Sequence, residues 1–218
     1  MPAPTDSFYV NVTLTDVQLA SSYYPILVDI AKHKHCLTYG ELVERAKAEY
    51  PDRTVVQKAI AVSTGRRLDV VRMFTAYLEL PDLTSLVINK GSGECGAGFT
   101  NHFNPQVARE NVFAFDWSTA TLDFDGFVKT TETAITPRKK VNEGKALQLM
   151  AAYYLKHKAV LSPSIRAQRE LIIELIMEGF SEEDAFKQAT SVDSAVVKIS
   201  VMGGVGEAHR GENSGPRA

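Results

Sequence analysis

Hydrophobic and polar residues alternate at the start of the chain and then change to a helical spacing. In residues 8–14 every second side chain is apolar, which predicts a strand with one buried face. Residues 16–34 instead carry apolar side chains at the spacing of a helix, and Pro25 is predicted to kink or break it. The N-terminal region is therefore expected to be a strand followed by a long helical segment.

A second helix has a clear start in the segment LTYGELVERA. Thr38 and Glu41 have the spacing of a capping box, in which each side chain bonds a backbone N–H group at the helix entrance. Pro51 ends this helix. Two further helices are predicted at residues 54–62 and 66–80, the second because its apolar residues recur every three or four positions.

The middle of the chain is predicted to be mainly β-structure. Leu86, Val87 and Ile88 are the apolar part of a strand predicted at 84–89, which leads into the glycine-rich segment 91–96. We expect a β-hairpin here whose second strand passes through Phe99. Alternating apolar residues predict another strand at 111–117, and residues 121–130 predict a strand and a turn. These strands make the expected first domain α+β.

The last third is predicted to be helical after a polar boundary. Its expected elements are three helices, an edge strand and a disordered tail, at residues 145–158, 164–178, 181–190, 196–200 and 201–218. The predicted organisation is a domain at 1–129, a linker at 130–144, a helical domain at 145–200 and the tail at 201–218.

Composition indicates a folded cytoplasmic protein. Hydrophobic residues make up 44% and charged residues 23% of the 218 positions, as in globular domains. No apolar run is long enough to span a bilayer, and the N-terminus lacks a secretory signal pattern. Cys36 and Cys95 lie far apart in the sequence, which suits a reducing compartment, although they could pair if the fold brought them together.

Charge is distributed unevenly although the net charge is only −2. Residues 128–170 carry nine Lys and Arg against three Glu, whereas residues 171–195 carry one Lys against six acidic residues. A basic segment is thus followed by an acidic one, and the basic segment is a candidate surface for an acidic protein partner. Its predicted contact residues are Arg138, Lys139, Lys140, Arg166 and Arg169.

The predicted order of helices and hairpin in residues 22–100 is that of a winged helix-turn-helix domain. In such domains a recognition helix enters the DNA major groove, and arginine there can bind guanine through two hydrogen bonds. Residues 38–90 carry eight basic against seven acidic residues, which gives little electrostatic attraction to DNA. The predicted contacts with double-stranded DNA are Arg66, Arg67, Arg72, Lys58, Lys90, Ser92 and Gly93.

Two segments of this region resemble a known family. LTYGELVERA is similar to the PYGxxxxYGxLA entry to the DNA-binding domain of alkylguanine-DNA alkyltransferases and alkyltransferase-like proteins, and PDLTSLVINKGSGECGAGF is similar to their PxxxPCHRVVxxxGxxGGF segment. The resemblance covers residues 22–100 and implies a winged-helix DNA-binding fold. Where the family has its alkyl-accepting Cys-His pair, this chain has Thr84, Ser85 and Leu86, so methyl transfer to cysteine is not expected.

Three other interpretations lack part of the pattern that they need. The glycine-rich segment matches the dinucleotide fingerprint G-x-G-x-x-G, but no helix-forming sequence follows Gly96, as nucleotide binding would require. His33, His35 and Cys36 resemble a fragment of a zinc site but have no matching pair elsewhere. A nuclease site would need its carboxylates on adjacent strands, which the sequence does not predict for Asp116, Asp123, Asp125, Glu143 and Lys145.

We therefore predict an α+β protein with a winged helix-turn-helix-like domain, extra strands, and a small helical domain after them. The predicted function is DNA binding without catalysis or a cofactor, as a regulator or an accessory factor. The alternative function is that of a protein-interaction or inhibitor factor, which docks on an acidic partner through residues 138–169.

Overall fold

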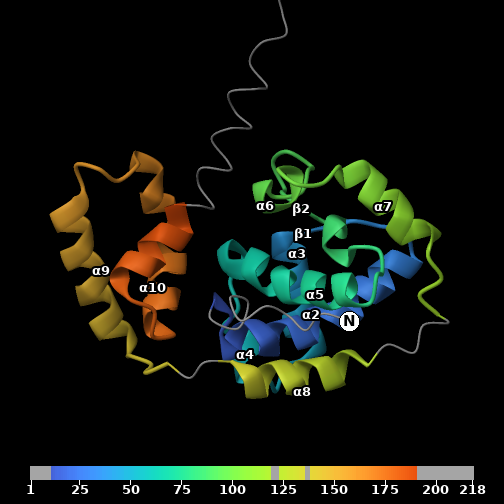
Figure 1. Ribbon diagram of the computed structural model, residues 1–218, viewed down its shortest axis with the longest axis horizontal. Helices are drawn as coiled ribbons and strands as arrows, with labels where there is room; N and C mark the ends of the chain where they lie inside the picture. Colours follow the sequence, from blue (N-terminus) through green and yellow to red (C-terminus); the bar gives the residue numbers. More distant parts are fainter. Residues whose placement is uncertain (1–10, 119–122, 136–137, 191–218) are drawn as a thin grey trace, which may run out of the picture.

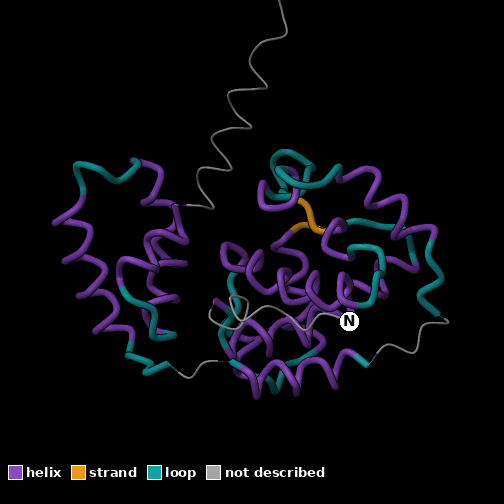
Figure 2. The backbone as a smooth tube through the Cα atoms, in the orientation of Figure 1, coloured by secondary structure: helices purple, strands orange, loops and turns teal. Residues whose placement is uncertain are grey.

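The computed structural model describes residues 11–118, 123–135 and 138–190, and helices dominate it (Figures 1 and 2). Within these residues one sheet is present, and it has two strands of two residues each. The predicted α+β winged-helix fold with added strands is therefore wrong. In chain order the elements are α2 (Leu14–Lys32), β1 (Leu37–Thr38), α3 (Tyr39–Glu49), α4 (Thr54–Gln57), η1 (Ala61–Ser63), α5 (Thr64–Tyr77), η2 (Leu83–Leu86), β2 (Val87–Ile88), α6 (Ala97–Thr100), α7 (Pro105–Ala114), α8 (Phe124–Ala134), α9 (Glu143–His157), η3 (Pro163–Gln168) and α10 (Arg169–Met177), followed by helical residues 182–190.

Two separate hydrophobic clusters organise the described residues. The first contains buried side chains from positions 12–128, and the second contains buried side chains from positions 146–189. We call residues 11–135 the N-terminal unit and residues 138–190 the C-terminal unit. Figure 1 shows the two units side by side, joined along one edge by the chain that follows α8.

Helix α2 forms the centre of the N-terminal unit. Thr13 and Asp16 make a buried capping box at its start, in which each side chain bonds the backbone N–H of the other residue. The predicted strand at 8–14 is wrong over its described part, because Leu14 is already the first residue of this helix. Pro25 lies inside the helix and does not divide it.

Helix α8 closes the core against α2 and α5. The ring of Phe124 in α8 stacks on Tyr24 at a centroid distance of 4.1 Å and meets Phe74 of α5 at 4.8 Å. The predicted strand and turn at 121–130 are wrong over the described part. The Asp123 side chain accepts a hydrogen bond from the Gly126 N–H at 2.7 Å and thereby starts a helix.

Helix α7 replaces the strand predicted at residues 111–117. The Asn104 side chain accepts hydrogen bonds from the N–H groups of Gln106 and Val107, and Pro105 occupies the first helical position. This start signal outweighs the alternating apolar pattern further along. The helix then ends at Ala114, in the middle of the predicted strand.

The two short strands join distant parts of the N-terminal unit. β1 and β2 are parallel, with Leu37 opposite Val87 and Thr38 opposite Ile88, so β2 retains only the end of the strand predicted at 84–89. The next residues form a closed turn, in which the Asn89 N–H donates to the Glu94 carbonyl at 2.8 Å.

The predicted β-hairpin and its return strand are also wrong. After the turn the chain enters α6, a four-residue helix that contains Phe99 and has Gly96 as its N-cap. Gly96 donates its N–H to the Tyr39 hydroxyl at 3.2 Å, and a Cβ at this position would lie 2.7 Å from that oxygen. The glycine therefore permits a close approach of α3 to this turn.

The C-terminal unit consists of helices, and this prediction is confirmed. Helix α9, the pair η3 and α10, and helical residues 182–190 lie close to the predicted ranges 145–158, 164–178 and 181–190. The range predicted as a linker, 130–144, also contains the end of α8 and the start of α9. The edge strand and tail predicted after residue 195 lie outside the described residues. No helix in the described part is long and apolar enough to cross a membrane.

The segment that enters the C-terminal unit lies against the end of α10. The Val141 N–H donates to the Met177 carbonyl at 3.1 Å. Gly179 has a φ of +90°, and a Cβ there would lie 2.8 Å from both the Arg138 Cβ and the Lys139 carbonyl oxygen. Only glycine combines this backbone conformation with so close an approach.

Candidate functional site

The two arginines at the start of α5 lie in the contact between the units. The Arg67 side chain is 2% exposed, lies 3.3 Å from Asp16 and forms an ion pair with Glu174 of α10. The Arg66 Nη2 lies 3.0 Å from an Asp16 oxygen, and its Nη1 donates to Gln188. Both guanidinium groups predicted to contact DNA therefore bind groups of this protein.

Asp16 is at the centre of this ionic cluster. Burial favours its protonated form, but Arg66 and Arg67, together with the Thr13 N–H, outweigh burial, so the pKa of the Asp16 carboxyl is lowered. The carboxylate is consequently charged near neutral pH. A buried ionic contact thus joins α2 and α5 of the N-terminal unit to α10 of the C-terminal unit.

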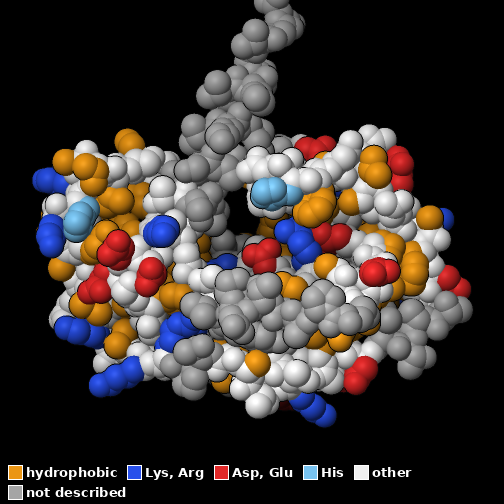
Figure 3. Space-filling model, in the orientation of Figure 1, with side chains coloured by type: hydrophobic (Ala, Val, Ile, Leu, Met, Phe, Trp, Pro, Cys, Tyr) orange, Lys and Arg blue, Asp and Glu red, His pale blue; other side chains and the backbone are white. Residues whose placement is uncertain are grey.

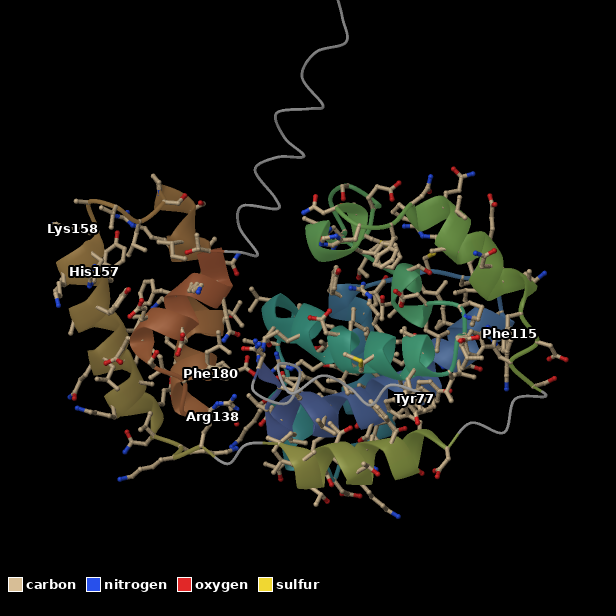
Figure 4. All side chains as sticks on the ribbon, viewed as in Figure 1. Tyr77, Phe115, Arg138, His157, Lys158 and Phe180 are labelled. Carbon is tan, nitrogen blue, oxygen red and sulfur yellow. The ribbon has the colours of Figure 1, made fainter. Side chains whose placement is uncertain are left out.

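One of the predicted partner-binding residues, Arg138, also serves this contact between the units, and a second, Lys140, is paired within the C-terminal unit. Arg138 donates to the Val12 carbonyl at 3.2 Å, and its guanidinium carbon lies 4.1 Å from the centre of the Phe180 ring. Figure 4 shows Arg138 and Phe180 in the region where the units face each other. Lys140 forms an ion pair with Glu178 at 2.9 Å. These two cations are therefore engaged within the chain.

Arg72 links three elements of the N-terminal unit. Its Nε lies 2.8 Å from Asp82, and its Nη2 donates to the Thr84 hydroxyl at 2.9 Å. Its guanidinium carbon also lies 5.0 Å from the Phe99 ring centre and 5.6 Å from the Phe103 ring centre. The third arginine predicted to bind DNA thus holds η2 and α6 against α5.

The remaining predicted DNA contacts are exposed, but the β-hairpin wing that was expected to carry the residues around the turn is not formed by the described residues. Lys58 is the C-cap of α4, and Lys90 lies in the closed turn that follows β2. In that turn the Ser92 hydroxyl accepts the Glu94 N–H at 3.2 Å, and Gly93 has a φ of +69°. Ser92 and Gly93 therefore shape a turn, and no second strand extends from it within the described residues.

A different surface has the composition of a binding site. One side of α9 and the chain after it carry exposed residues that we call the α9 face: Lys145, Gln148, Ala151, Ala152, Leu155, Lys156, Lys158 and Val160. Leu155 is 65% exposed and Val160 is 83% exposed. Figure 4 places Lys158 at the outer edge of the C-terminal unit, away from the N-terminal unit, and Figure 3 shows Lys and Arg side chains along this edge.

The cations on and beside the α9 face form no ion pair with any residue that the structure describes. No ion pair joins Lys145, Lys156 or Lys158 to another described residue, and the same holds for Arg169 at the start of α10. Arg166 is exposed and donates to the Tyr154 hydroxyl of α9 at 2.9 Å. Of the predicted partner-binding residues, Lys139, Lys140, Arg166 and Arg169 are thus exposed, Lys140 is paired with Glu178, and Arg166 adjoins the α9 face.

The alternative sites gain no geometric support. No group of three His, Cys, Asp or Glu that could hold a metal occurs among the described residues. Two carboxylates considered for a nuclease have local roles, since Asp123 caps α8 and Asp116 bonds the Ser118 hydroxyl. The helix after Gly96 has four residues, which is too short for the phosphate-binding helix of a dinucleotide site.

The segment ALQLMAAYYL is a signal in the sequence for the α9 face, because it places apolar residues on more than one side of a helix. Leu147, Leu149, Met150, Tyr153 and Tyr154 pack partly buried against the second hydrophobic cluster. Ala151, Ala152 and Leu155 are apolar residues of the same segment that stay exposed.

No family model, no curated protein and no solved structure matches this chain. The resemblance to alkylguanine-DNA alkyltransferases therefore has no support from these comparisons. Among the described residues, the arginines at the start of α5 are engaged with carboxylates of the chain, whereas the α9 face is exposed.

Proposed function

We propose that this protein is an interaction factor that binds an acidic protein partner through the α9 face. The observation that carries the proposal is the coincidence of exposed apolar and unpaired cationic side chains on this surface. Leu155 and Val160 have the largest exposures among the large hydrophobic residues described, and they adjoin lysines that form no ion pair with another described residue. Exposed apolar groups of this kind are a mark of interaction surfaces.

The arrangement follows the anatomy of a protein interface. Such interfaces have an apolar centre that becomes buried and a polar rim that remains near solvent. On the α9 face Ala151, Ala152 and Leu155 supply the apolar positions, and lysines lie before and after them along the helix. Residues 143–169 carry five Lys and Arg against one Glu, a formal charge of +4, which favours an acidic partner.

Double-stranded DNA fits this surface less well than a protein does. Binding to the phosphate backbone needs positive charge but makes no use of an exposed leucine and valine. The arginines at positions 66, 67 and 72, which would have bound base edges, are engaged with carboxylates of the protein itself. Geometry therefore moves the proposed binding surface from α5 to α9 and changes the class of ligand.

The apolar residues should contribute more affinity than the lysines. Complete burial of a leucine side chain stabilises a complex by about 1.5–3 kcal/mol, and Leu155 has roughly two thirds of its surface left to bury. Each exposed ion pair contributes at most about 1 kcal/mol and weakens with salt. Leu155→Ser should thus weaken binding by about 10-fold, since 1.4 kcal/mol corresponds to one factor of ten.

Site-specific photo-cross-linking tests the proposal. A photoreactive residue at Gln148, which is exposed on the α9 face, should cross-link the full-length chain to an acidic protein in an extract of its own cells. The same residue at Lys129, which is exposed on α8, provides the matched control and should give no such product. The product at position 148 should weaken with rising salt and disappear with Leu155→Ser and Val160→Ser combined.

Three results would contradict this function. A cross-link that survives the double apolar variant would show that the α9 face is not the binding surface. A product that joins two copies of the chain would assign the face to self-association. Finally, wild-type binding to duplex DNA that is lost on Lys145→Gln, Lys156→Gln and Lys158→Gln together would make the ligand a nucleic acid.

A further inference from the structure

The short parallel sheet brings the two cysteines of the chain into one region. Cys36 immediately precedes Leu37, which lies opposite Val87 in the sheet, and Ser85 in η2 lies two residues before Val87. Adjacent strands lie about 4.8 Å apart. The Cys95 sulfur lies 3.2 Å from the Ser85 carbonyl oxygen. Both thiols are therefore beside the same short stretch of backbone, although 58 residues separate them in the sequence.

A single arginine contacts this region and interacts with both thiols. The Arg109 Nε donates to the Ser85 carbonyl at 2.9 Å, and its Nη2 lies 3.3 Å from the Cys95 sulfur and 3.3 Å from Glu94. Its positive charge also acts on Cys36, and the Cys36 thiol acts electrostatically on Cys95. Arg109 thus provides a positive charge that contacts the Cys95 sulfur and also acts on Cys36.

The two thiols differ in their access to solvent. Cys36 is exposed, whereas Cys95 is 2% exposed. Burial raises the pKa of both thiols, and Arg109 opposes this shift in each case. An oxidant in solution consequently reaches Cys36 first, and Cys95 can react only with a group that the protein itself presents.

We propose that Cys36 and Cys95 form an oxidisable pair that a hydroperoxide converts into an intramolecular disulfide. The Cys36 thiolate attacks one oxygen of the peroxide, the O–O bond breaks, and Cys36 becomes a sulfenic acid while hydroxide leaves. The Cys95 sulfur then attacks the Cys36 sulfur, the S–O bond breaks, and water leaves as the S–S bond forms. Overall two thiols and one hydrogen peroxide give one disulfide and two waters.

Arg109 has a defined role in the second step. Cys95 must lose its proton to attack, and its burial opposes formation of the thiolate. The guanidinium at 3.3 Å stabilises that charge as it develops. Arg109→Gln should therefore slow disulfide formation about 10-fold, whereas Arg109→Lys, which keeps the charge, should restore part of the rate. A purely structural arginine would not give this difference between variants of equal thermal stability.

Intact-mass measurement after treatment with hydrogen peroxide tests the pair. The full-length chain should lose the mass of two hydrogen atoms, gain no oxygen, and retain no thiol that an alkylating reagent can label after denaturation. With Cys95→Ser, Cys36 should accumulate as a sulfenic acid that dimedone traps. With Cys36→Ser, Cys95 should remain a free thiol because it is buried. The same oxidation in denaturant should form the intramolecular disulfide more slowly.

Several results would overturn the proposal. Wild-type protein that keeps two alkylatable thiols after this treatment would show that the pair does not react. Oxygen added to Cys36 without disulfide formation would show that Cys95 cannot reach it. A disulfide between two chains would assign the reactivity to the exposed Cys36 alone. An equal rate in the folded and denatured chain would show that the fold does not bring the thiols together.

Discussion

The arginines of the N-terminal unit and the lysines of the α9 face differ in whether the protein itself engages them. In the N-terminal unit every arginine donates to another group of the protein: Arg45, Arg53, Arg66, Arg67, Arg72 and Arg109. In the C-terminal unit the cations of the α9 face form no ion pair with a described residue. The unit predicted to bind DNA thus has its arginines occupied, and the unit predicted to be an accessory helical domain has its lysines available.

The contrast shows that cation counts in a sequence do not identify a binding surface. Arginine has five donors in a planar group, so it can join two or three elements of a fold, as Arg72 does. Lysine is strongly hydrated and more often stays in solvent. A cation is free to bind a partner only if no carboxylate of the same chain pairs with it. Asp16 and Glu174 both pair with Arg67.

The largest expected effect concerns Arg67 itself. Arg67→Met should lower the free energy of unfolding by about 3 kcal/mol, because it breaks a buried ion pair. This value is at the lower end of the range for such pairs, since Asp16 still has Arg66 as a partner. Lys156→Met on the α9 face is the matched control and should change it by less than about 0.5 kcal/mol. Urea unfolding measures both. Similar losses in the two variants would remove the distinction between the units.

A smaller effect is expected from acid. The pKa of Asp16 is lowered in the folded protein, so its ionisation stabilises the fold above the ordinary value of 3.8, and this contribution is lost as the pH falls through the lowered value. Protonation leaves Arg67 paired with Glu174, which is why the loss should be smaller than that of Arg67→Met.

Unfolding free energy measured from pH 6 down to pH 2 tests this dependence. Asp16→Asn should flatten the decline at the acid end, whereas Glu183→Gln, at an exposed carboxylate of the C-terminal unit, should leave the profile unchanged. The same decline in Asp16→Asn as in wild type would show that other carboxylates carry the acid sensitivity.

The smallest effects come from two helix caps, one in each unit. The Asn142 side chain accepts the Lys145 N–H at 2.9 Å at the start of α9, and the Thr38 side chain accepts the Glu41 N–H at 3.2 Å at the start of α3. Replacing either by alanine should cost about 1 kcal/mol. The two hydrophobic clusters are separate, so calorimetry should show two unfolding transitions. Asn142→Ala should lower the midpoint temperature of one, and Thr38→Ala should lower that of the other. Equal shifts of a single transition would mean that the units unfold together.

The sequence predicted helices well where their start signals were local. The capping box of Thr38 and Glu41 is present as predicted, and the helices of the C-terminal unit lie near their predicted ranges. It predicted strands badly, because alternation over a few residues also fits a helix that is packed on more than one side. The caps at Asn104 and Asp123 were the better signals for α7 and α8, and the apolar alternation concealed them.

Only part of the candidate site could be predicted from the sequence. The excess of basic residues after position 128 was visible, and Arg166 and Arg169 of that segment are exposed, while their contact with a partner stays a prediction. The engagement of Arg66 and Arg67 was not visible, because their partners include Glu174 and Gln188, more than one hundred residues away. Long-range ion pairs of this kind leave no periodic trace in a sequence.

Gly179 shows how a residue without a side chain can determine where a charge acts. Gly179 has no Cβ, so the chain at Arg138 and Lys139 can lie directly against the end of α10. Arg138 therefore stays with the C-terminal unit while its guanidinium reaches the Val12 carbonyl of the N-terminal unit. Any larger residue at position 179 would lift this segment and withdraw the arginine from its acceptor. The alignment of the two units thus depends on Gly179, although this residue has no side chain that could contact the N-terminal unit.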